Sequence, residues 1–408
     1  MPNEDLVIDD MGLNLTSHFP LSQVIRTEDT AASPAKNIDI LSYRSCDQAC
    51  RHCSYVESER SPERPHSSDA EVDFIHLLKS NYPSSTFFLY PRDIVTASPL
   101  LPVMKEINQS ETLTNGNRLD VALVDHLLEN GIKRIQITLF GTLAEQQRYN
   151  RNSPEEYERI KANIKLCIER GLRVQVNNVL SRETMESMEL LGDECVRLGV
   201  RRLRFIRLQP VGDAINAFKS NVYLTQSDLE DFIIPTVERL KQKFRRQLSL
   251  YFAVNFGPNF YGMTPEKARE MLRKRSPQSS SDTFCPAIDG QYWNISTKSG
   301  NVHWCFNNLA EGNTRIGKVD WETGVVTLDR PVDLSRETLQ KKLRGICAAE
   351  ACPYQEVCLG GCRSAAISFA TDDTGEERFY SGMDMCLTPA YSRYHKYQNS
   401  VGKDETGV

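Results

Sequence analysis

The sequence lacks a long hydrophobic run and a surplus of positive charge. No stretch approaches the roughly 18 apolar residues that a membrane-spanning helix needs. The first residues, 1–10, are acidic, unlike a signal peptide. The formal net charge is −5, which leaves no basic footprint for nucleic acid. We therefore expect neither a membrane nor a nucleic acid as a partner, and we predict an acidic enzyme of the cytoplasm.

Cysteine, by contrast, is abundant, with 12 residues in a chain of 408. Because cytoplasmic thiols stay reduced, these residues are better explained as metal ligands than as disulfides. Cys46, Cys50 and Cys53 have the spacing C-x3-C-x2-C directly after the strand-like run 38–42. Three thiolates so close together can hold one face of an iron-sulfur cube and leave the fourth iron open for chemistry. Zinc or a chance cluster is the alternative, although zinc usually takes two pairs of ligands.

A second group of thiols lies in the last third of the chain. Cys305 follows a hairpin-like turn at Gly300–Asn301. The spacing C-x5-C-x3-C then follows, ahead of one solitary thiol. Cys167 and Cys195 lie between the two groups, at helical positions with apolar neighbours, and are predicted to pack in the core. The C-terminal thiols are Cys285, Cys305, Cys347, Cys352, Cys358, Cys362 and Cys386.

Between the two groups, short β-branched or aromatic runs alternate with helical segments, as in βα units on a parallel sheet. Six repeats are present, two fewer than a closed barrel needs, so the pattern favours an α/β fold with an open, partial (β/α)6 barrel. Gly131, Gly171 and Gly199 follow three of the helices as C-terminal signals. The predicted strands are 38–43, 86–90, 111–114, 134–140, 173–180 and 203–208. The predicted helices are 69–79, 99–108, 119–130, 154–170, 184–198 and 226–244.

Composition divides the chain into four parts. Residues 1–37 are polar, show no strong periodicity, and are predicted to be a lead-in or cap. The barrel is predicted to span 38–245, and 246–284 a helix-rich bridge with a charged, Ser-rich linker. Residues 285–408 form the predicted Cys-rich α+β domain and a tail.

The C-x3-C-x2-C motif at the end of a first strand resembles the signature of the radical SAM enzymes. The resemblance implies that Cys46, Cys50 and Cys53 bind a four-iron four-sulfur cluster, whose open iron is chelated by S-adenosylmethionine (SAM). One electron then cleaves SAM and yields a 5′-deoxyadenosyl radical that abstracts hydrogen from a C–H bond. His52 stands where the family usually has an aromatic residue.

The C-terminal thiols resemble the SPASM extension of that family, which carries two auxiliary iron-sulfur clusters. The resemblance assigns Cys285, Cys305 and Cys362 to the first auxiliary cluster and Cys347, Cys352, Cys358 and Cys386 to the second. The first set has three thiols, so its fourth ligand is a non-Cys residue or a substrate, or that iron is open. Four residues separate Cys347 from Cys352, where the family usually has two. Zinc is again the alternative.

Candidate SAM contacts lie where the predicted strands end, because active-site residues of parallel barrels gather there. Tyr90 and Asp93 follow the second strand, where the family usually has a Gly-Gly-Glu-Pro loop for the SAM amino group. Those glycines are absent, so Asp93 or backbone carbonyls are the substitutes, and a plain turn is the alternative. Asn115 belongs to a Thr-Asn-Gly sequence that matches a family loop near SAM, although Asn-Gly is also a turn signal.

Further along the chain, the resemblance assigns Thr138 to the SAM ribose and Arg151 to its carboxylate. A guanidinium suits a carboxylate because its planar fork forms two hydrogen bonds. Arg148 is the competing choice, and a solvated surface arginine is the alternative for either. Asn177 and Leu208, near the ends of the next two strands, complete the predicted SAM-side or substrate-side positions.

Three functions are compatible with these motifs. Auxiliary clusters can accept an electron from a substrate radical, which favours oxidation or cross-linking of a ribosomally made peptide. The second hypothesis is oxidation or epimerisation of a small molecule such as an aminoglycoside, which the lack of room for a leader-binding domain favours. The third is an iron-sulfur electron carrier, which has no need of an open-site triple. Expected partners of the enzyme are a reductase such as flavodoxin or ferredoxin and, for a peptide, a separate leader-binding protein.

Sulfatase maturation is disfavoured, because Phe306 stands where those members tend to place an acidic residue.

Overall fold

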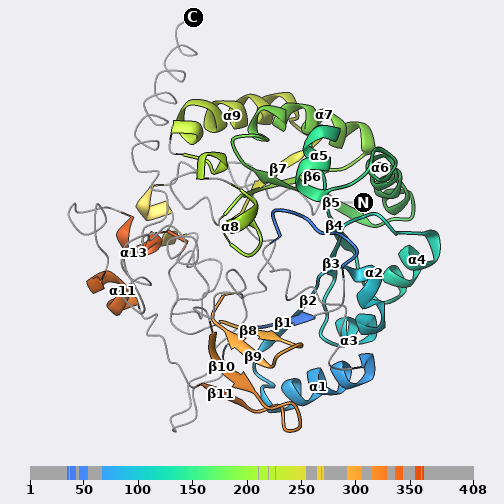
Figure 1. Ribbon diagram of the computed structural model, residues 1–408, viewed down its shortest axis with the longest axis vertical. Coiled ribbons are helices and arrows are strands. Elements are labelled where there is room, and N and C mark those ends of the chain that lie inside the picture. The colour runs from blue at the N-terminus through green and yellow to red at the C-terminus, as the bar shows by residue number, and fades with distance from the viewer. Residues whose placement is uncertain are drawn as a thin grey trace, which may run out of the picture.

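A computed structural model describes most of the barrel and parts of the C-terminal third (Figure 1). The described residues are 35, 37–42, 46–53, 67–209, 211–218, 220–225, 227–253, 264–267, 269–270, 292–305, 315–328, 336–342, 354–359 and 361–362.

Seven parallel strands form the wall of a partial barrel, which confirms the predicted fold class. β1 pairs with β2, and β3 to β7 pair in chain order, all in parallel. Figure 1 shows them in an arc with the helices outside it. No end of the six predicted strands is displaced by more than two residues. The strands are β1 (Asn37–Ser42), β2 (Thr86–Pro91), β3 (Glu111–Thr114), β4 (Arg134–Thr138), β5 (Arg173–Leu180), β6 (Arg202–Arg207) and β7 (Ser249–Phe252).

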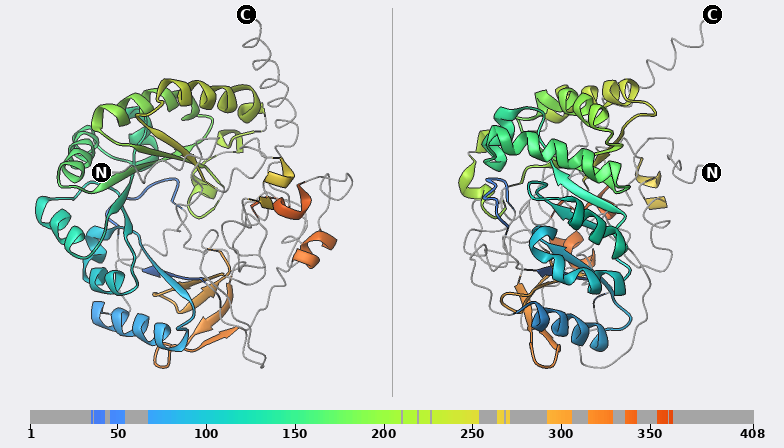
Figure 2. Two further views of the ribbon diagram at one scale, coloured as in Figure 1. Left: turned by 180° about the vertical axis from the view of Figure 1, so that it is seen from behind. Right: turned by 90° about the vertical axis from the view of Figure 1, so that its right-hand side faces the viewer.

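The C-terminal third returns to the first strand of the barrel. β8 (Tyr292–Ser296) pairs in parallel with β1, and β9 (Asn301–His303) follows as its antiparallel neighbour. β10 (Arg315–Val319) and β11 (Val326–Leu328) extend this antiparallel part, which lies beside β1 in both views of Figure 2. β1 is therefore an interior strand of a six-stranded sheet, with β2 on one side and β8 on the other.

This arrangement changes the predicted division of the chain. β7 lies after residue 245, the predicted end of the barrel, and extends the sheet through its pairing with β6. β8 comes from the predicted C-terminal domain but pairs with the barrel. The bridge was predicted to be helical, because a strand of four residues shows too short an alternation of apolar and polar residues to be recognised.

Helices α1, α4, α6, α7 and α9 cover the outer face of the arc (Figure 1). Gly131, Gly171 and Gly199 have φ values of +82°, +97° and +81°, so they end helices as predicted. In the last predicted helix, a π-helical turn, Asp228–Ile233, precedes α9 (Ile234–Lys243). The other helices are α1 (Ser68–Asn81), α2 (Ile94–Ala97), α3 (Leu101–Glu106), α4 (Val121–Glu129), α5 (Leu143–Asn150), α6 (Pro154–Glu169), α7 (Met188–Leu198), α8 (Ala214–Ala217), α11 (Arg336–Lys342) and α13 (Gln355–Cys358).

The main core lies between these helices and the sheets. Alternate residues of β4, Ile135 and Ile137, are fully buried in it. Gly192 of α7 faces the ring of Phe244, and a Cβ at this position would collide with that ring. The absence of a side chain at Gly192 therefore lets Phe244 pack directly on α7.

The inner face of the arc is polar. Arg134 donates to Glu111 at 2.7 Å, and Gln136 donates to the other oxygen of the same carboxylate. Asn177 donates to Gln136 at 2.7 Å and accepts from Gln175 at 3.0 Å. These hydrogen bonds give partners to polar side chains that are buried inside the barrel, away from water.

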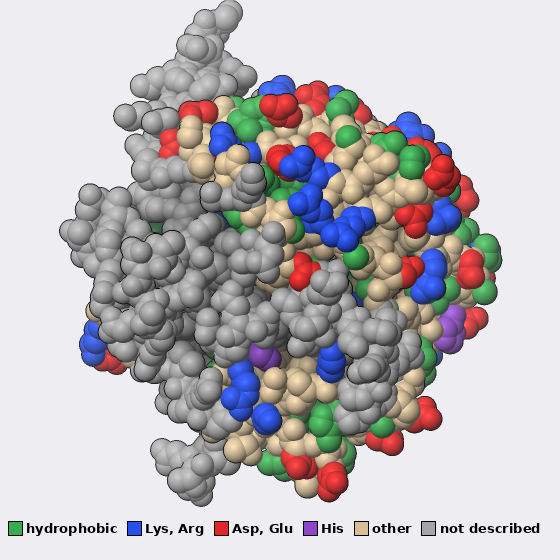
Figure 3. Space-filling view, in the orientation of Figure 1, with side chains coloured by type: hydrophobic (Ala, Val, Ile, Leu, Met, Phe, Trp, Pro, Cys, Tyr) green, Lys and Arg blue, Asp and Glu red, His purple; other side chains and the backbone are tan. Residues whose placement is uncertain are grey.

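The described surface carries charge of both signs. In Figure 3, lysines and arginines are interspersed with aspartates and glutamates around the rim of this face. Within the described residues, every helix is too short or too polar to span a bilayer.

Candidate functional site

The loop 46–53, which we call the Cys loop, follows β1 and contains the three clustered thiols. Cys46, Cys50 and Cys53 are half-buried. The Arg51 N–H donates to the carbonyl of Tyr149 at 2.8 Å, and its guanidinium donates to the carbonyl of Ala217 at 2.6 Å. The Cys loop is therefore fixed against α5 and α8, two helices far along the chain.

Aromatic rings hold the same loop from one side. The imidazole of His52 lies edge-on to Phe140, with ring centroids 5.8 Å apart, and is tilted against Tyr149 at 6.2 Å. Tyr149 stacks on Phe140 at 4.9 Å, and its hydroxyl lies 2.5 Å from Ser181 Oγ. His52 thus packs among aromatic rings, at the position where the resemblance implies an aromatic residue.

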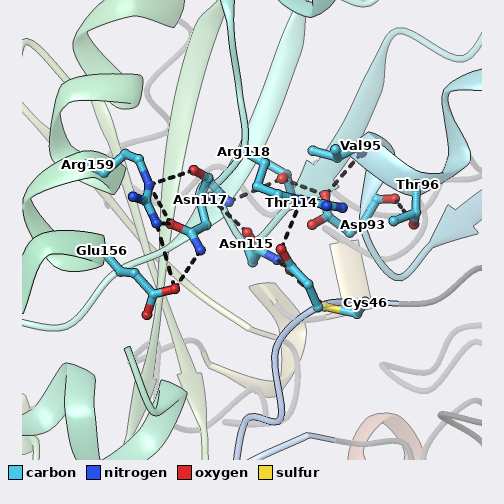
Figure 4. Close-up of polar contacts among 12 residues, drawn as sticks. Cys46, Asp93, Val95, Thr96, Thr114, Asn115, Asn117, Arg118, Glu156 and Arg159 are labelled. Carbon is cyan, nitrogen blue, oxygen red and sulfur yellow. Dashed lines mark hydrogen bonds and ion pairs between the residues drawn. The ribbon is translucent and has the colours of Figure 1, made fainter. Parts of the chain in front are cut away.

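On its other side, the Cys loop meets the loop that follows β3. Asn115 Nδ2 lies 3.7 Å from Cys46 Sγ and 2.5 Å from Asp47 Oδ1, and it donates to both (Figure 4). Arg118 Nε forms an ion pair with Asp47 Oδ2 at 2.9 Å. These contacts join segments 68 residues apart in the chain. Sequence reasoning did not identify Asp47 or Arg118, although Asp47 lies inside the motif.

The β3 loop is itself braced from behind. Gly116 has a φ of +83°, and a Cβ there would lie 2.8 Å from Ile137 Cγ2, so only glycine fits without a shift. Asn117 donates to Glu156 at 2.9 Å and accepts from Arg159 at 2.7 Å, as Figure 4 shows. The brace fixes the loop to the first turns of α6.

Asp93, after β2, is fully buried beside this loop. Its Oδ1 accepts from the N–H of Val95 at 3.1 Å, which caps α2, and from Thr114 Oγ1 at 2.6 Å. Its Oδ2 is buried and has no hydrogen-bond partner among the described residues. Burial raises the pKa of Asp93 to about 6, although the bonds from Thr114 and Val95 oppose that rise. Ligand atoms of Cys46, Asp47 and Asp93 lie within 4.8 Å of one another.

The grouping of Cys46, Asp47 and Asp93 suits two kinds of ligand. A thiolate with two carboxylates is a donor set for a single metal ion. The buried, unpartnered oxygen of Asp93 also suits a cationic group of a ligand held beside the three thiols. Burial raises the pKa of Cys46 to about 11, so this thiol stays protonated at neutral pH until a metal binds it.

We expect Asp93→Asn to stabilise the metal-free chain at pH 7 but not at pH 4. A carboxyl whose pKa rises from 3.8 to about 6 on folding loses stability as the pH rises through that interval, by about 3 kcal/mol at most. The amide removes this loss and can still accept from Val95 and Thr114. Urea unfolding at both pH values measures the difference. Asp120→Asn is the matched control, because Asp120 also caps a helix but is exposed. Equal effects of the two variants at pH 7 would contradict the prediction.

The other predicted SAM-side residues are spread around the arc. Tyr90 is half-buried on β2, with its ring 4.4 Å from Phe88, and Thr138 is half-buried at the end of β4. Asn177 lies within the polar network of the interior, and Leu208 packs in a small apolar cluster with Phe140 and Tyr149. The structure therefore brings Asp93 and Asn115 together with Cys46, whereas no described contact joins the other four to the Cys loop.

The two candidate arginines differ in their surroundings. Arg151 is exposed and has a φ of +59°, a left-handed conformation at the end of α5. No ion pair involves it among the described residues. Arg148 is already paired with Glu183. Arg151 is thus the arginine whose guanidinium is available to a ligand.

The C-terminal thiols are described in part. Cys305 follows β9, Cys358 ends α13, and Cys362 lies just beyond it; all three are half-buried. The remaining four thiols of that group lie outside the described residues: Cys285, Cys347, Cys352 and Cys386. Cys167 and Cys195 are fully buried in α6 and α7, which confirms their prediction as core residues.

Comparison with known proteins adds relatives that span most of the chain. A search of protein-family profiles found no match. The chain is 24% identical over 395 residues to an AdoMet-dependent heme synthase of Nitratidesulfovibrio vulgaris Hildenborough, covering 93% of this chain and all of the relative. It is 23% identical over 278 residues to a protein of the same name from Methanosarcina barkeri, covering 65% and 72% of the two chains.

Two solved structures share the fold. Streptococcus suis SuiB bound to its precursor peptide SuiA matches with a TM-score of 0.62 at 15% identity, over 85% of this chain and 75% of SuiB. The protein anSMEcpe with bound AdoMet matches with a TM-score of 0.60 at 14% identity, over 88% and 96% of the two chains. A further structure of anSMEcpe, which also holds the Cp18Cys peptide, matches with a TM-score of 0.59.

Proposed function

We propose that this chain is a radical SAM enzyme of the SPASM subgroup that oxidises or cross-links a ribosomally synthesised peptide. The AdoMet-dependent relatives and the fold shared with SuiB and anSMEcpe support this proposal. The observation that carries the proposal is the grouping of Cys46, the first of three half-buried thiols in the Cys loop, with the buried carboxylate of Asp93 at the end of β2. When bound there, a four-iron four-sulfur cluster with an open iron supplies the electron that cleaves SAM to a 5′-deoxyadenosyl radical, which abstracts hydrogen from the substrate.

The residues around the Cys loop fit such a cluster. Cys46, Cys50 and Cys53 provide three thiolate donors, and the loop is held from both sides before any metal binds. The Asn115 amide already donates to Cys46 Sγ, as expected beside a thiolate ligand. A zinc site needs a fourth protein ligand for closed coordination, and the carboxylates of Asp47 and Asp93 are the nearest candidates.

Asp93 and the strand ends would hold SAM. The Oδ2 of Asp93, which accepts no hydrogen bond from a described residue, is suited to the ammonium of SAM. The exposed guanidinium of Arg151 is suited to the SAM carboxylate, and Thr138 to the ribose. Tyr90, Asn177 and Leu208 remain candidate positions on the SAM or substrate side.

Cys305, Cys358 and Cys362 would belong to auxiliary clusters that remove an electron from the substrate radical. Their partners in this proposal are Cys285, Cys347, Cys352 and Cys386, with one ligand of the first cluster still open. β8 pairs with β1 and β9 with β8, so Cys305, which follows β9, lies on the side of the barrel where β1 leads into the Cys loop. A reductase such as flavodoxin or ferredoxin would supply the initiating electron.

A peptide substrate is supported by the neighbours SuiB and anSMEcpe, both of which were crystallised with peptides. A small-molecule substrate is the second candidate, and the name heme synthase of the sequence relatives favours it. The polar inner face, with Arg134, Arg202 and Gln175, is compatible with either class of substrate.

Anaerobic reconstitution with iron and sulfide tests the proposal. We expect about twelve irons per chain, for three four-iron clusters, and 5′-deoxyadenosine after addition of SAM and dithionite. A candidate peptide or tetrapyrrole is then the substrate if it yields a product in a SAM-dependent manner. About four irons per chain together with SAM cleavage would contradict the presence of auxiliary clusters. Bound zinc without SAM cleavage would contradict the whole proposal.

A further inference from the structure

We propose that the Asn115 amide positions Cys46 and tunes the reduction potential of the iron-sulfur cluster bound through this thiol. Asp47 and Arg118 complete the arrangement, and we call these three residues the Cys46 clamp. The inference rests on the proposed function, because it concerns the cluster that this function requires. The clamp assigns Asn115 to the cluster ligand Cys46, whereas the resemblance to the radical SAM family implies that Asn115 contacts SAM.

The hydrogen bonds of Asn115 fix the direction of its amide. Its Oδ1 accepts from the backbone N–H of Asn117 at 2.8 Å, which turns the amino group toward the Cys loop. A side-chain amide has two N–H hydrogens, and here two acceptors lie in reach: Cys46 Sγ at 3.7 Å and Asp47 Oδ1 at 2.5 Å. Both donors of Asn115 are therefore used within the clamp, and none is left for SAM.

Asp47 places a negative charge directly beside the first thiol. One of its oxygens accepts from Asn115, and the other pairs with Arg118 at 2.9 Å. The side chains of Asp47 and Arg118 are 28% and 51% exposed, so solvent and salt screen this pair in part. The guanidinium compensates the carboxylate.

Each member of the clamp acts on the cluster with a definite sign. Reduction adds negative charge, and cluster potentials depend on net charge and on hydrogen bonds to sulfur. An N–H donor on Cys46 stabilises the reduced state and raises the potential. A carboxylate beside the cluster lowers the potential, and a guanidinium that compensates this carboxylate raises it again.

The test is a redox titration of the reconstituted full-length chain followed by electron paramagnetic resonance. The signal that changes on addition of SAM identifies the cluster of the Cys loop. Asn115→Leu keeps the size of the side chain but removes the donor. We expect it to lower the ratio of reduced to oxidised cluster at least tenfold at a fixed potential, a shift of about 59 mV for one electron.

Two further variants keep the test decisive if Asn115→Leu fails to fold. Arg118→Gln should also lower the potential, by an amount that shrinks as salt is added, and Asp47→Asn should raise it. Arg170→Gln is the matched control: Arg170 forms an exposed ion pair with Asp125, and no described contact joins it to the Cys loop or to the loop after β3. This control should leave the potential unchanged.

The outcomes separate the inference from the proposed function. Unchanged potentials in all three clamp variants, or shifts of the same sign for Asp47→Asn and Arg118→Gln, overturn the clamp and leave the radical SAM proposal standing. A wild-type chain with no SAM-sensitive cluster signal overturns both. Opposite shifts for Asp47→Asn and Arg118→Gln support the clamp, because a purely structural role would not reverse sign with charge.

Discussion

Cys46→Ala is expected to reduce SAM cleavage to the background of the assay. Cys46 is the thiol that the Asn115 amide contacts, and its loss leaves two thiolates for a cluster that needs three. The measurement is formation of 5′-deoxyadenosine by the reconstituted chain under dithionite, together with an iron count. We expect the count to fall by about four, the content of one cube.

Cys167→Ala is the control for this variant, since it also removes one thiol. Cys167 is fully buried in α6, where it packs in the main apolar core. Its substitution should cost about 1 kcal/mol of stability through lost packing and leave the iron count unchanged. Full SAM cleavage by Cys46→Ala would show that the Cys loop is not the site of SAM chemistry.

Cys358→Ala is expected to separate SAM cleavage from product formation. Cys358 ends α13, outside the barrel strands and the Cys loop, so the SAM site should keep its ligands. We expect about four irons to be lost with the second auxiliary cluster, 5′-deoxyadenosine still to form, and product to fall to a trace. The measurements are the iron count, 5′-deoxyadenosine, and product by mass spectrometry once a substrate is known.

Cys195→Ala serves as the control for Cys358→Ala. This thiol is also in a helix, α7, but it is fully buried in the core. The iron content and the ratio of product to 5′-deoxyadenosine should therefore be those of the wild type. An unchanged product yield in Cys358→Ala would contradict an essential second auxiliary cluster. Loss of SAM cleavage as well would show that Cys358 belongs to the catalytic centre or that the whole chain needs Cys358 for stability.

The loop after β3 is encoded in the local sequence only in part. The sequence Thr114-Asn115-Gly116 indicates a turn, and the φ of Gly116 agrees with it. What Asn115 touches depends on the return of the Cys loop to the same edge of the sheet. The periodicity of a helix or a strand indicates which face a side chain occupies. It does not indicate that Asn115 contacts Asp47, which lies 68 residues away in the chain.

The order of the strands shows the same limit. Each predicted strand of the barrel is present because alternation of apolar residues and flanking turns are local properties. The pairing of β1 with β8 joins residues more than 250 positions apart, such as Asn37 and Tyr292, and no local pattern encodes it. β7 was missed for a related reason, since its four residues are too few for a clear period.

The sequence by itself determined the parallel barrel, the burial of Cys167 and Cys195, and the three-thiol motif, because periodicity, composition and ligand spacing are all written along the chain. Only the tertiary structure decided that Asp93 is buried with one oxygen that accepts no hydrogen bond from a described residue, and that Asn115, Asp47 and Arg118 meet at Cys46. The physical reason is that burial and electrostatic contact depend on distances between strand ends, which are set when parallel strands align their carboxyl ends at one edge of the sheet.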